Sequence, residues 1–351
     1  MDTRGEKSYV WLLAGGAVLA LIVVSVLVWM LKGEPSSSGS KSADSADSRS
    51  KAKDNDDDKK DKKKKDKKDS DLGQEARQWS GEEMHESSGV ASVPGTDQFL
   101  FVDDKDNKNI YCATISDAGE QTGELITVPL GVTVEDAEDI TFDGTYFYVV
   151  GSQYRKKSNT GAGLIRFKYD ANSHTASGVE SVADLSARLI KGVPELSGAQ
   201  GQMRTEDAIN IEGLGWDPAN KRLLLGLRNP LIDGQALLVP VVLKDPSAAL
   251  SADNMSFGAA IKLGLEGFAI RSIAYDAGAG HFILIAGATE GEKSDGFVLW
   301  SWDGSGAPAK LMELDKKIKP EGVTSVDRNG KRSILVVGDA GYYLSLAEPG
   351  Q

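Results

Sequence analysis

The chain has little of the chemistry on which most enzymes depend. Its 351 residues include one cysteine and three histidines, His85, His174 and His281, which lack the spacing of metal ligands. No G-x-S-x-G segment occurs, which excludes the nucleophile elbow of the α/β-hydrolases. A single cysteine cannot form a disulfide within the chain. Cys112, in the apolar stretch 109–115, is therefore expected to be a buried thiol.

Positive charge is scarce in most of the chain. The net charge is −12, residues 1–50 are balanced, and residues 51–71 contain ten lysines and eight aspartates, so that residues 72–351 carry −14. A nucleic-acid-binding protein needs a basic surface that neutralises phosphates, and this part of the chain has too few basic residues to form one. We therefore expect no nucleic acid partner.

Charge is absent from residues 9–31, YVWLLAGGAVLALIVVSVLVWML. As a helix this segment would be roughly 34 Å long, enough to cross a bilayer. Tyr9, Trp11 and Trp29 lie near its ends, as aromatic anchors do, and no small-residue cleavage site follows. The sequence predicts a short tail (residues 1–8) and an uncleaved signal anchor that spans the membrane once. We expect the remainder to be exported, to the periplasm or the cell exterior.

Residues 32–78 contain almost no large apolar residues. Serine, glycine and alanine give way to a run of lysine and aspartate. Such a segment cannot bury enough surface to offset its conformational entropy, so a disordered linker is predicted. The last predicted part of the chain, residues 79–351, is one folded domain.

A strand–turn–strand pattern occurs five times in that domain. Each copy has a short apolar run, a turn rich in Asp, Gly, Pro or Asn, and a second, more apolar run. The copies are residues 89–104, 139–153, 212–229, 271–288 and 321–340. A hairpin repeated about every fifty residues is typical of a β-propeller, because one small sheet cannot bury its own faces. The predicted fold class is all-β.

Further strands complete most of the repeats. Third strands are predicted at 109–115, 163–169, 235–243, 296–302 and 342–346. Fourth strands are predicted at 123–131, 178–185, 259–265 and 309–314. The fifth repeat ends before its fourth strand, so residues 72–87 are candidates to complete it. Five blades are favoured, with a helical insertion at 154–206; six blades are the alternative.

In a propeller, the start of each first strand and the end of each second strand meet at one mouth of the central channel. We predict that nine polar residues gather there. They are Asp104, Glu138, Asp139, Glu212, Arg228, Asn229, Arg271, Glu321 and Asp339.

Two interpretations of this cluster remain open. Glu138, Glu212 and Glu321 are candidate ligands for Ca²⁺ or Mg²⁺, which prefer oxygen ligands. Alternatively, Arg228 and Arg271 pair with the glutamates and hold the blades together without a metal.

Residues 210–241, NIEGLGWDPANKRLLLGLRNPLIDGQALLVPV, resemble a bacterial family of unknown function with IEGLxWDP, LLLGLRNPL and GxALLVP strands. The resemblance extends over roughly residues 88–345. It implies a β-propeller related to the esterase-like phytases, and it implies no reaction. Gln153 stands where that family usually has histidine, which weakens any inference of a histidine-assisted activity from the resemblance.

The sequence therefore predicts a membrane-anchored propeller that binds a small molecule or protein at its acidic mouth. A metal-dependent hydrolase of phosphoesters or lactones is the first alternative. A purely structural scaffold is the second.

Overall fold

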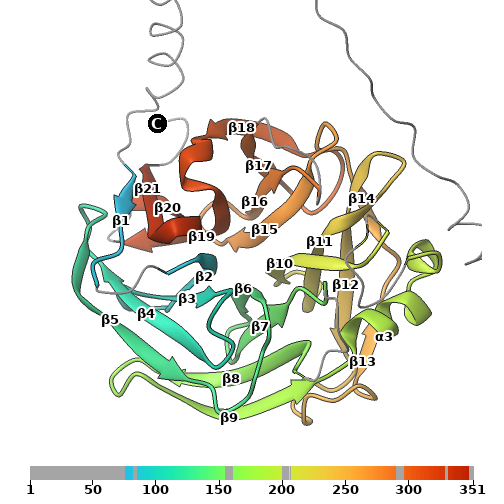
Figure 1. The fold of residues 1–351 in the computed structure, drawn as a ribbon, viewed down its shortest axis with the longest axis horizontal. Coiled ribbons are helices and arrows are strands. Elements are labelled where there is room, and N and C mark those ends of the chain that lie inside the picture. The colour runs from blue at the N-terminus through green and yellow to red at the C-terminus, as the bar shows by residue number, and fades with distance from the viewer. Residues whose placement is uncertain are drawn as a thin grey trace, which may run out of the picture. The chain divides into compact units, whose positions relative to one another are not determined.

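The computed structural model describes residues 76–81, 85–154, 161–199, 205, 207–289, 296–328 and 331–347. Within these residues five antiparallel sheets surround a central axis (Figure 1). Their inner strands contact one another in a closed ring. The all-β prediction and the number of blades are confirmed, and the six-bladed alternative is wrong. The predicted membrane helix and the predicted linker up to residue 75 lie outside the described residues, and the last residues of that linker form β1 (Arg77–Gln78). Among the described residues no helix is long and apolar enough to span a membrane.

In blades one to four the strands follow the chain from the axis outward, and in blade five β1 is added as the outer strand. Blade one contains β2 (Ser87–Ser92), β3 (Gln98–Asp103), β4 (Asn109–Ile115) and β5 (Gln121–Pro129). Blade two contains β6 (Ala137–Phe142), β7 (Phe147–Gly151), β8 (Leu164–Asp170) and β9 (Thr175–Val182). Blade three contains β10 (Asn210–Asp217), β11 (Arg222–Ile232), β12 (Gln235–Leu243), β13 (Met255–Phe257) and β14 (Ile261–Leu263). Blade four contains β15 (Ala269–Asp276), β16 (His281–Gly287), β17 (Phe297–Trp302) and β18 (Ala309–Leu314). Blade five contains β19 (Pro320–Arg328), β20 (Lys331–Gly338), β21 (Tyr342–Ala347) and β1 (Arg77–Gln78).

The ring is closed by β1, which pairs antiparallel with β21 and so completes blade five. Directly after β1, Trp79 stacks on Tyr343 of blade five at 4.2 Å and on Phe101 of blade one at 5.1 Å between ring centroids. Its indole N–H donates to the Ser87 hydroxyl, which in turn donates to the Gly338 carbonyl. The prediction that residues 72–87 complete the last blade is therefore confirmed.

The outer strands are where the predicted boundaries were least accurate. β5 and β9 begin two and three residues earlier than predicted, because these strands are largely exposed and have a weak apolar pattern. In blade three the outer edge is shared by β14 and an unpredicted strand, β13. They pair with β12 on either side of Pro240, which has no N–H to donate to the ladder.

The long insertion between blades two and three contains α3 (Leu185–Gly192) and a 3₁₀ turn, η1 (Pro194–Leu196), which confirms the predicted helical segment. Leu185 and Leu189 are fully buried in the apolar cluster that joins these two blades.

Neighbouring blades are joined by buried aliphatic and aromatic side chains. On β11, Leu223, Leu225 and Leu227 belong to the cluster shared with blade two, whereas Leu224 packs with Ile273 of blade four. Both faces of such a strand are buried, which explains its continuous apolar sequence. Each fully buried side chain of this kind contributes roughly 1.5–3 kcal/mol.

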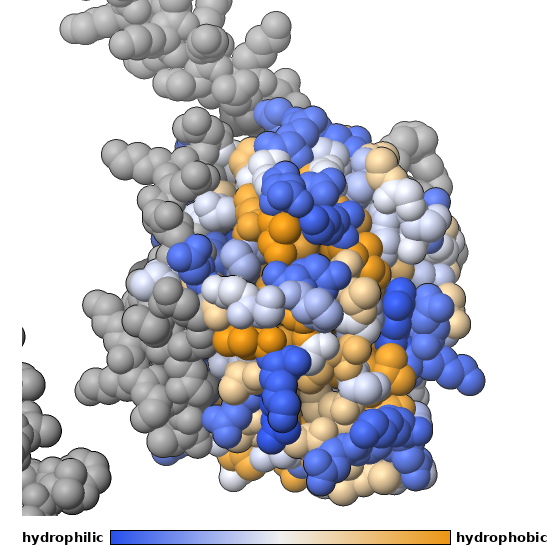
Figure 2. Space-filling model, turned by 90° about the vertical axis from the view of Figure 1, so that its right-hand side faces the viewer, coloured by the Kyte–Doolittle hydropathy of each residue, from blue (hydrophilic) through white to orange (hydrophobic). Residues whose placement is uncertain are grey.

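The outer surface is mixed in polarity. Figure 2 shows the side that carries α3 and blade three, where apolar and polar residues alternate. Val242, at 38% exposure, is the one large hydrophobic residue that is exposed among the described residues.

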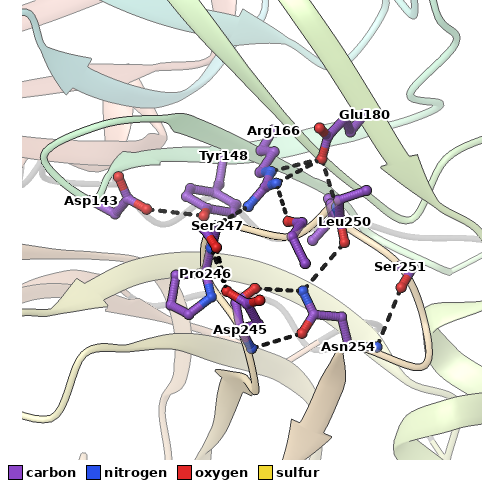
Figure 3. Close-up of polar contacts among 12 residues, drawn as sticks. Asp143, Tyr148, Arg166, Glu180, Asp245, Pro246, Ser247, Leu250, Ser251 and Asn254 are labelled. Carbon is purple, nitrogen blue, oxygen red and sulfur yellow. Dashed lines mark hydrogen bonds and ion pairs between the residues drawn. The ribbon is translucent and has the colours of Figure 1, made fainter.

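A buried arginine joins blades two and three near their outer edges (Figure 3). Arg166 on β8 is 1% exposed and contacts Glu180 on β9 at 2.8 Å. Its guanidinium also donates to the carbonyls of Pro246 and Ala248 in the loop between β12 and β13. The same loop donates the Leu250 N–H to Glu180, so each charge has several partners.

A β-bulge interrupts every inner strand at the same height. The register with the second strand shifts by one residue in all five hairpins. The residues at the shifts are Ser88, Glu138, Glu212, Arg271 and Glu321. A bulge turns the extra residue away from the ordinary alternation, and here all five residues line a cavity at the channel mouth.

Asp139, one residue below this level, ties the inner strands together. Its carboxylate accepts from the backbone N–H groups of Ile140 (2.9 Å), Leu214 (2.8 Å) and Ile273 (3.4 Å). It also accepts from the Ser272 hydroxyl (3.0 Å), whose oxygen accepts the Val323 N–H. The inner strands of blades two to five thus share one hydrogen-bond network on the axis.

The neighbouring positions leave room for this network because they are glycines. A Cβ atom on Gly89 would lie 2.2 Å from Oδ1 of Asp139. A Cβ atom on Gly322 would lie 2.0 Å from the Ser88 carbonyl oxygen. Real Cβ atoms do not approach other atoms this closely, so the inner strands of blades one, two and five can meet only without side chains there.

Replacing Asp139 by asparagine is expected to destabilise the fold by about 2–3 kcal/mol, because one carboxylate oxygen becomes an NH₂ group that faces N–H donors. Urea unfolding of the full-length protein, followed by tryptophan fluorescence, measures this. Asp117→Asn, at an exposed turn, is the matched control and should change little. Equal effects of the two substitutions would contradict the role of Asp139.

Candidate functional site

A cavity of about 550 Å³ opens at the end of the channel where the inner strands begin. Its carboxylates are Glu86, Asp104, Asp136, Glu138, Glu212, Glu321 and Asp339. Its cationic side chains are Arg228, Arg271, Lys316 and Lys319. Ser87, Ser88, Tyr154, Asn210, Ala288 and Phe297 complete the lining.

Seven of the nine residues predicted for the mouth line this cavity; the two that do not are Asp139 and Asn229. Asp139 is 1% exposed and lies in the axial network, one level below the cavity. Asn229 is 2% exposed and lies opposite Asn210 in the pairing of β10 with β11.

One side of the cavity holds a chain of ion pairs across blades three, four and five. Arg271 binds both carboxylate oxygens of Glu321, its Nε lying 2.6 Å from Oε2. The same Nε is 3.6 Å from Oε2 of Glu212. Arg228 reaches Oε1 of Glu212 at 3.1 Å and also donates to the Ala288 carbonyl. Both arginines on the lining are therefore already paired with carboxylates.

The positive charges of these arginines only partly offset the increase in pKa that burial causes in the neighbouring acids. Burial raises the pKa of Glu321 to about 7 although Arg271 acts in the opposite direction. Burial, with Glu212 and Asp136 nearby, holds the pKa of Glu138 well above its usual range. Burial alone would lower the pKa of Arg271, but Glu212 and Glu321 raise it, so Arg271 stays charged.

The other side of the cavity is acidic and has less compensation. Asp104 on blade one faces Asp339 of blade five and Asp136, which directly precedes blade two. Burial, followed by the charges of Asp339 and Asp103, raises the pKa of Asp104 to about 7. Lys319 lies 2.6 Å from Asp339, but it is 61% exposed at the rim. Bringing these carboxylates together costs free energy that a bound cation would recover.

Two oxygens in the lining have no hydrogen-bond partner among the described residues. Oδ1 of Asn210 is one, in a residue that is 1% exposed. Its Nδ2 donates to Glu212 at 3.0 Å, which fixes the orientation of the amide. Oδ1 of Asp104 is the other. Buried acceptors are rarely left unpaired, so both mark places where a donor is expected to bind.

Sequence reasoning missed several residues of the lining. Asp136, Asn210, Lys316 and Lys319 lie two to five residues ahead of the predicted positions Glu138, Glu212 and Glu321. Extending the predicted mouth to the whole loop before each inner strand would have included them. The unpaired state of Asn210 has no signal in the sequence.

The interpretation of Glu138, Glu212 and Glu321 as metal ligands is not supported. Among the residues that the structure describes, no group of three acids, histidines or cysteines could hold a metal ion. Glu212 and Glu321 both contact Arg271, so their oxygens face a guanidinium. The donor set fits ion pairing better than it fits Ca²⁺ or Mg²⁺.

One family profile matches part of the chain. The sequence profile of a family described as "Protein of unknown function (DUF3616)" matches residues 202–343, which span most of blades three to five. The resemblance noted at residues 210–241 lies within this match. No curated protein matches the chain. A relation to the esterase-like phytases stays a prediction.

Solved structures with low similarity include several enzymes. A GH43 β-1,3-galactosidase with galactodeoxynojirimycin is 11% identical, with 77% of this chain and 93% of that chain covered and a TM-score of 0.44. The soluble aldose sugar dehydrogenase of Escherichia coli is 9% identical, with 79% and 99% covered and a TM-score of 0.42. The periplasmic gluconolactonase of Pseudomonas aeruginosa is 13% identical, with 75% and 69% covered and a TM-score of 0.37. At these values nothing follows for the ligand of this protein.

Replacing Arg271 by methionine is expected to cost about 3–5 kcal/mol of stability near neutral pH, because buried glutamates lose their counter-charge. The loss of stability should be smaller at about pH 5.5, because the buried Glu321 is then largely protonated and needs no counter-charge. A carboxyl whose pKa is raised in the folded state stabilises the fold at low pH, and this contribution disappears as the pH rises. Urea unfolding of the full-length protein at both pH values measures the two losses.

Lys310→Met, in the exposed pair with Glu313, is the control and should change stability by less than about 1 kcal/mol. The double variant Arg271→Met, Glu321→Gln should recover part of the loss. An equal loss at both pH values would contradict the electrostatic explanation.

Proposed function

We propose that this propeller is a binding module that holds a small polar ligand in the cavity at its mouth. The observation that carries the proposal is the unpaired Oδ1 of Asn210, a buried acceptor in the cavity lining. A volume of about 550 Å³ is within the range of small-molecule sites.

The composition of the lining supports ligand binding over a purely structural role. A scaffold would need only the ion pairs of Arg228 and Arg271, which join blades three to five. Asp104 adds charge repulsion without joining blades, and Asn210 leaves an acceptor unpaired. Both features oppose folding unless a ligand compensates them, as is common at binding sites.

A metal-dependent hydrolase of phosphoesters or lactones is the weaker candidate. It would need a carboxylate cluster to hold a metal and activate water, and the described residues offer none. It would also need arginines able to clamp an anionic substrate, and Arg228 and Arg271 are paired with glutamates.

We also propose that residues 9–31 anchor the protein in a membrane, with the propeller on the exported side. The support is an uncharged run of 23 residues flanked by aromatic residues. A tethered module of this kind would bind its ligand outside the cytoplasm.

Replacing Asn210 by alanine is expected to weaken ligand binding by about tenfold or more, because the ligand loses the acceptor that has no partner among the described residues. A saturation-transfer NMR screen of the full-length protein against amines, sugars, amides and small carboxylates identifies the ligand. Asn172→Ala, at an exposed turn, is the matched control. A ligand that binds both variants as it binds the original protein does not occupy this cavity.

The membrane anchor predicts how the protein fractionates. The full chain should stay in the membrane pellet after extraction with alkaline carbonate, and a chain lacking residues 9–31 should be released. Protease added to intact spheroplasts should cleave the propeller domain if it is exported. Release of the full chain by carbonate would overturn the proposed anchor.

A further inference from the structure

The charges that line the cavity limit what its ligand can be. Seven carboxylates face four cationic side chains. Arg228, Arg271 and Lys319 each contact a carboxylate. Lys316 is exposed at the rim. An anionic ligand beside Arg228 or Arg271 would have to displace existing ion pairs, whereas a cation would compensate Asp104, whose Oδ1 has no hydrogen-bond partner among the described residues.

The two unpaired oxygens require a ligand that donates hydrogen bonds. Oδ1 of Asn210 can only accept, and so can Oδ1 of Asp104 when its carboxyl is ionised. A neutral polyol would satisfy these acceptors but would leave the repulsion between Asp104, Asp136 and Asp339 in place. An ammonium group satisfies both needs, because it carries three donors and a positive charge.

We infer that the ligand is a small primary amine whose ammonium group binds Asp104 and whose second N–H or O–H group donates to Asn210. This inference rests on the proposed function. Small diamines, amino alcohols and amino sugars have this chemistry. Lys319 lies near Asp104, and its bond to Asp339 leaves Asp104 for the ligand.

Binding of such an amine should release protons. The groups that face Asp104 are Asp103, Asp136, Glu321, Asp339 and Lys319. Burial and the four acids raise the pKa of Asp104 to about 7, so part of the population is protonated near neutral pH. An ammonium group favours the carboxylate, so affinity should rise as pH increases from about 6 to about 8.

Isothermal titration of the full-length protein with three matched pairs tests the inference. The pairs are ethanolamine with ethylene glycol, diaminobutane with butanediol, and glucosamine with glucose. At least one amine should bind at least about tenfold more tightly than its neutral partner, as a charged hydrogen bond would produce. Titrations in two buffers with different ionisation enthalpies should show proton release. Asp104→Asn should abolish both the preference and the release, and Asp117→Asn should abolish neither.

The outcomes separate this inference from the proposed function. A neutral compound that binds as tightly as its amine, and loses affinity in Asn210→Ala, would overturn the inference and leave the cavity as a binding site. If no amine binds more tightly than its partner, the inference is wrong. If the broader NMR screen also finds nothing that depends on Asn210, the proposed function is wrong as well.

Discussion

The hydrogen-bond network of Asp139 is the interaction on which the rest of the molecule depends. One carboxylate accepts from the inner strands of blades two, three and four, and Ser272 extends the network to blade five. Burial raises the pKa of Asp139, while the donors around it act in the opposite direction. Glycines at positions 89 and 322 give the carboxylate and the strands room to meet on the axis.

The bulges place two levels of side chains with different roles. At the lower level, Asp139 and Ser272 hold the strands together. At the upper level, Ser88, Glu138, Glu212, Arg271 and Glu321 turn into the cavity. The upper level is asymmetric: blades three to five supply the ion pairs of Arg271 and Arg228, whereas Asp104, Asp136 and Asp339 gather on the other side. This asymmetry gives the cavity a paired side and an acidic side, and it is the basis for expecting a cationic ligand.

Much of the fold could be predicted because the repeated hairpin is a local pattern. The apolar runs and turns located all five inner hairpins, and the missing fourth strand of the last repeat indicated the closing segment that contains β1. The site was predicted less completely. Glu138 and Asp139 were both assigned to the mouth because they stand at the start of an inner strand, and nothing in the sequence indicates the bulge that places them at different levels. Asn210 was missed because the predicted mouth of blade three began at Glu212, two residues later along the same strand.

A crystal structure of the full-length protein grown with diaminobutane at about pH 8 tests the central claim most directly. The account predicts one ammonium nitrogen within hydrogen-bond distance, about 2.7–3.2 Å, of Oδ1 of Asp104 and a second donor at Oδ1 of Asn210. The chain of ion pairs from Glu321 to Arg228 should be unchanged. A diamine bound elsewhere, or bound in the cavity after displacing Arg271 from Glu321, would contradict the account.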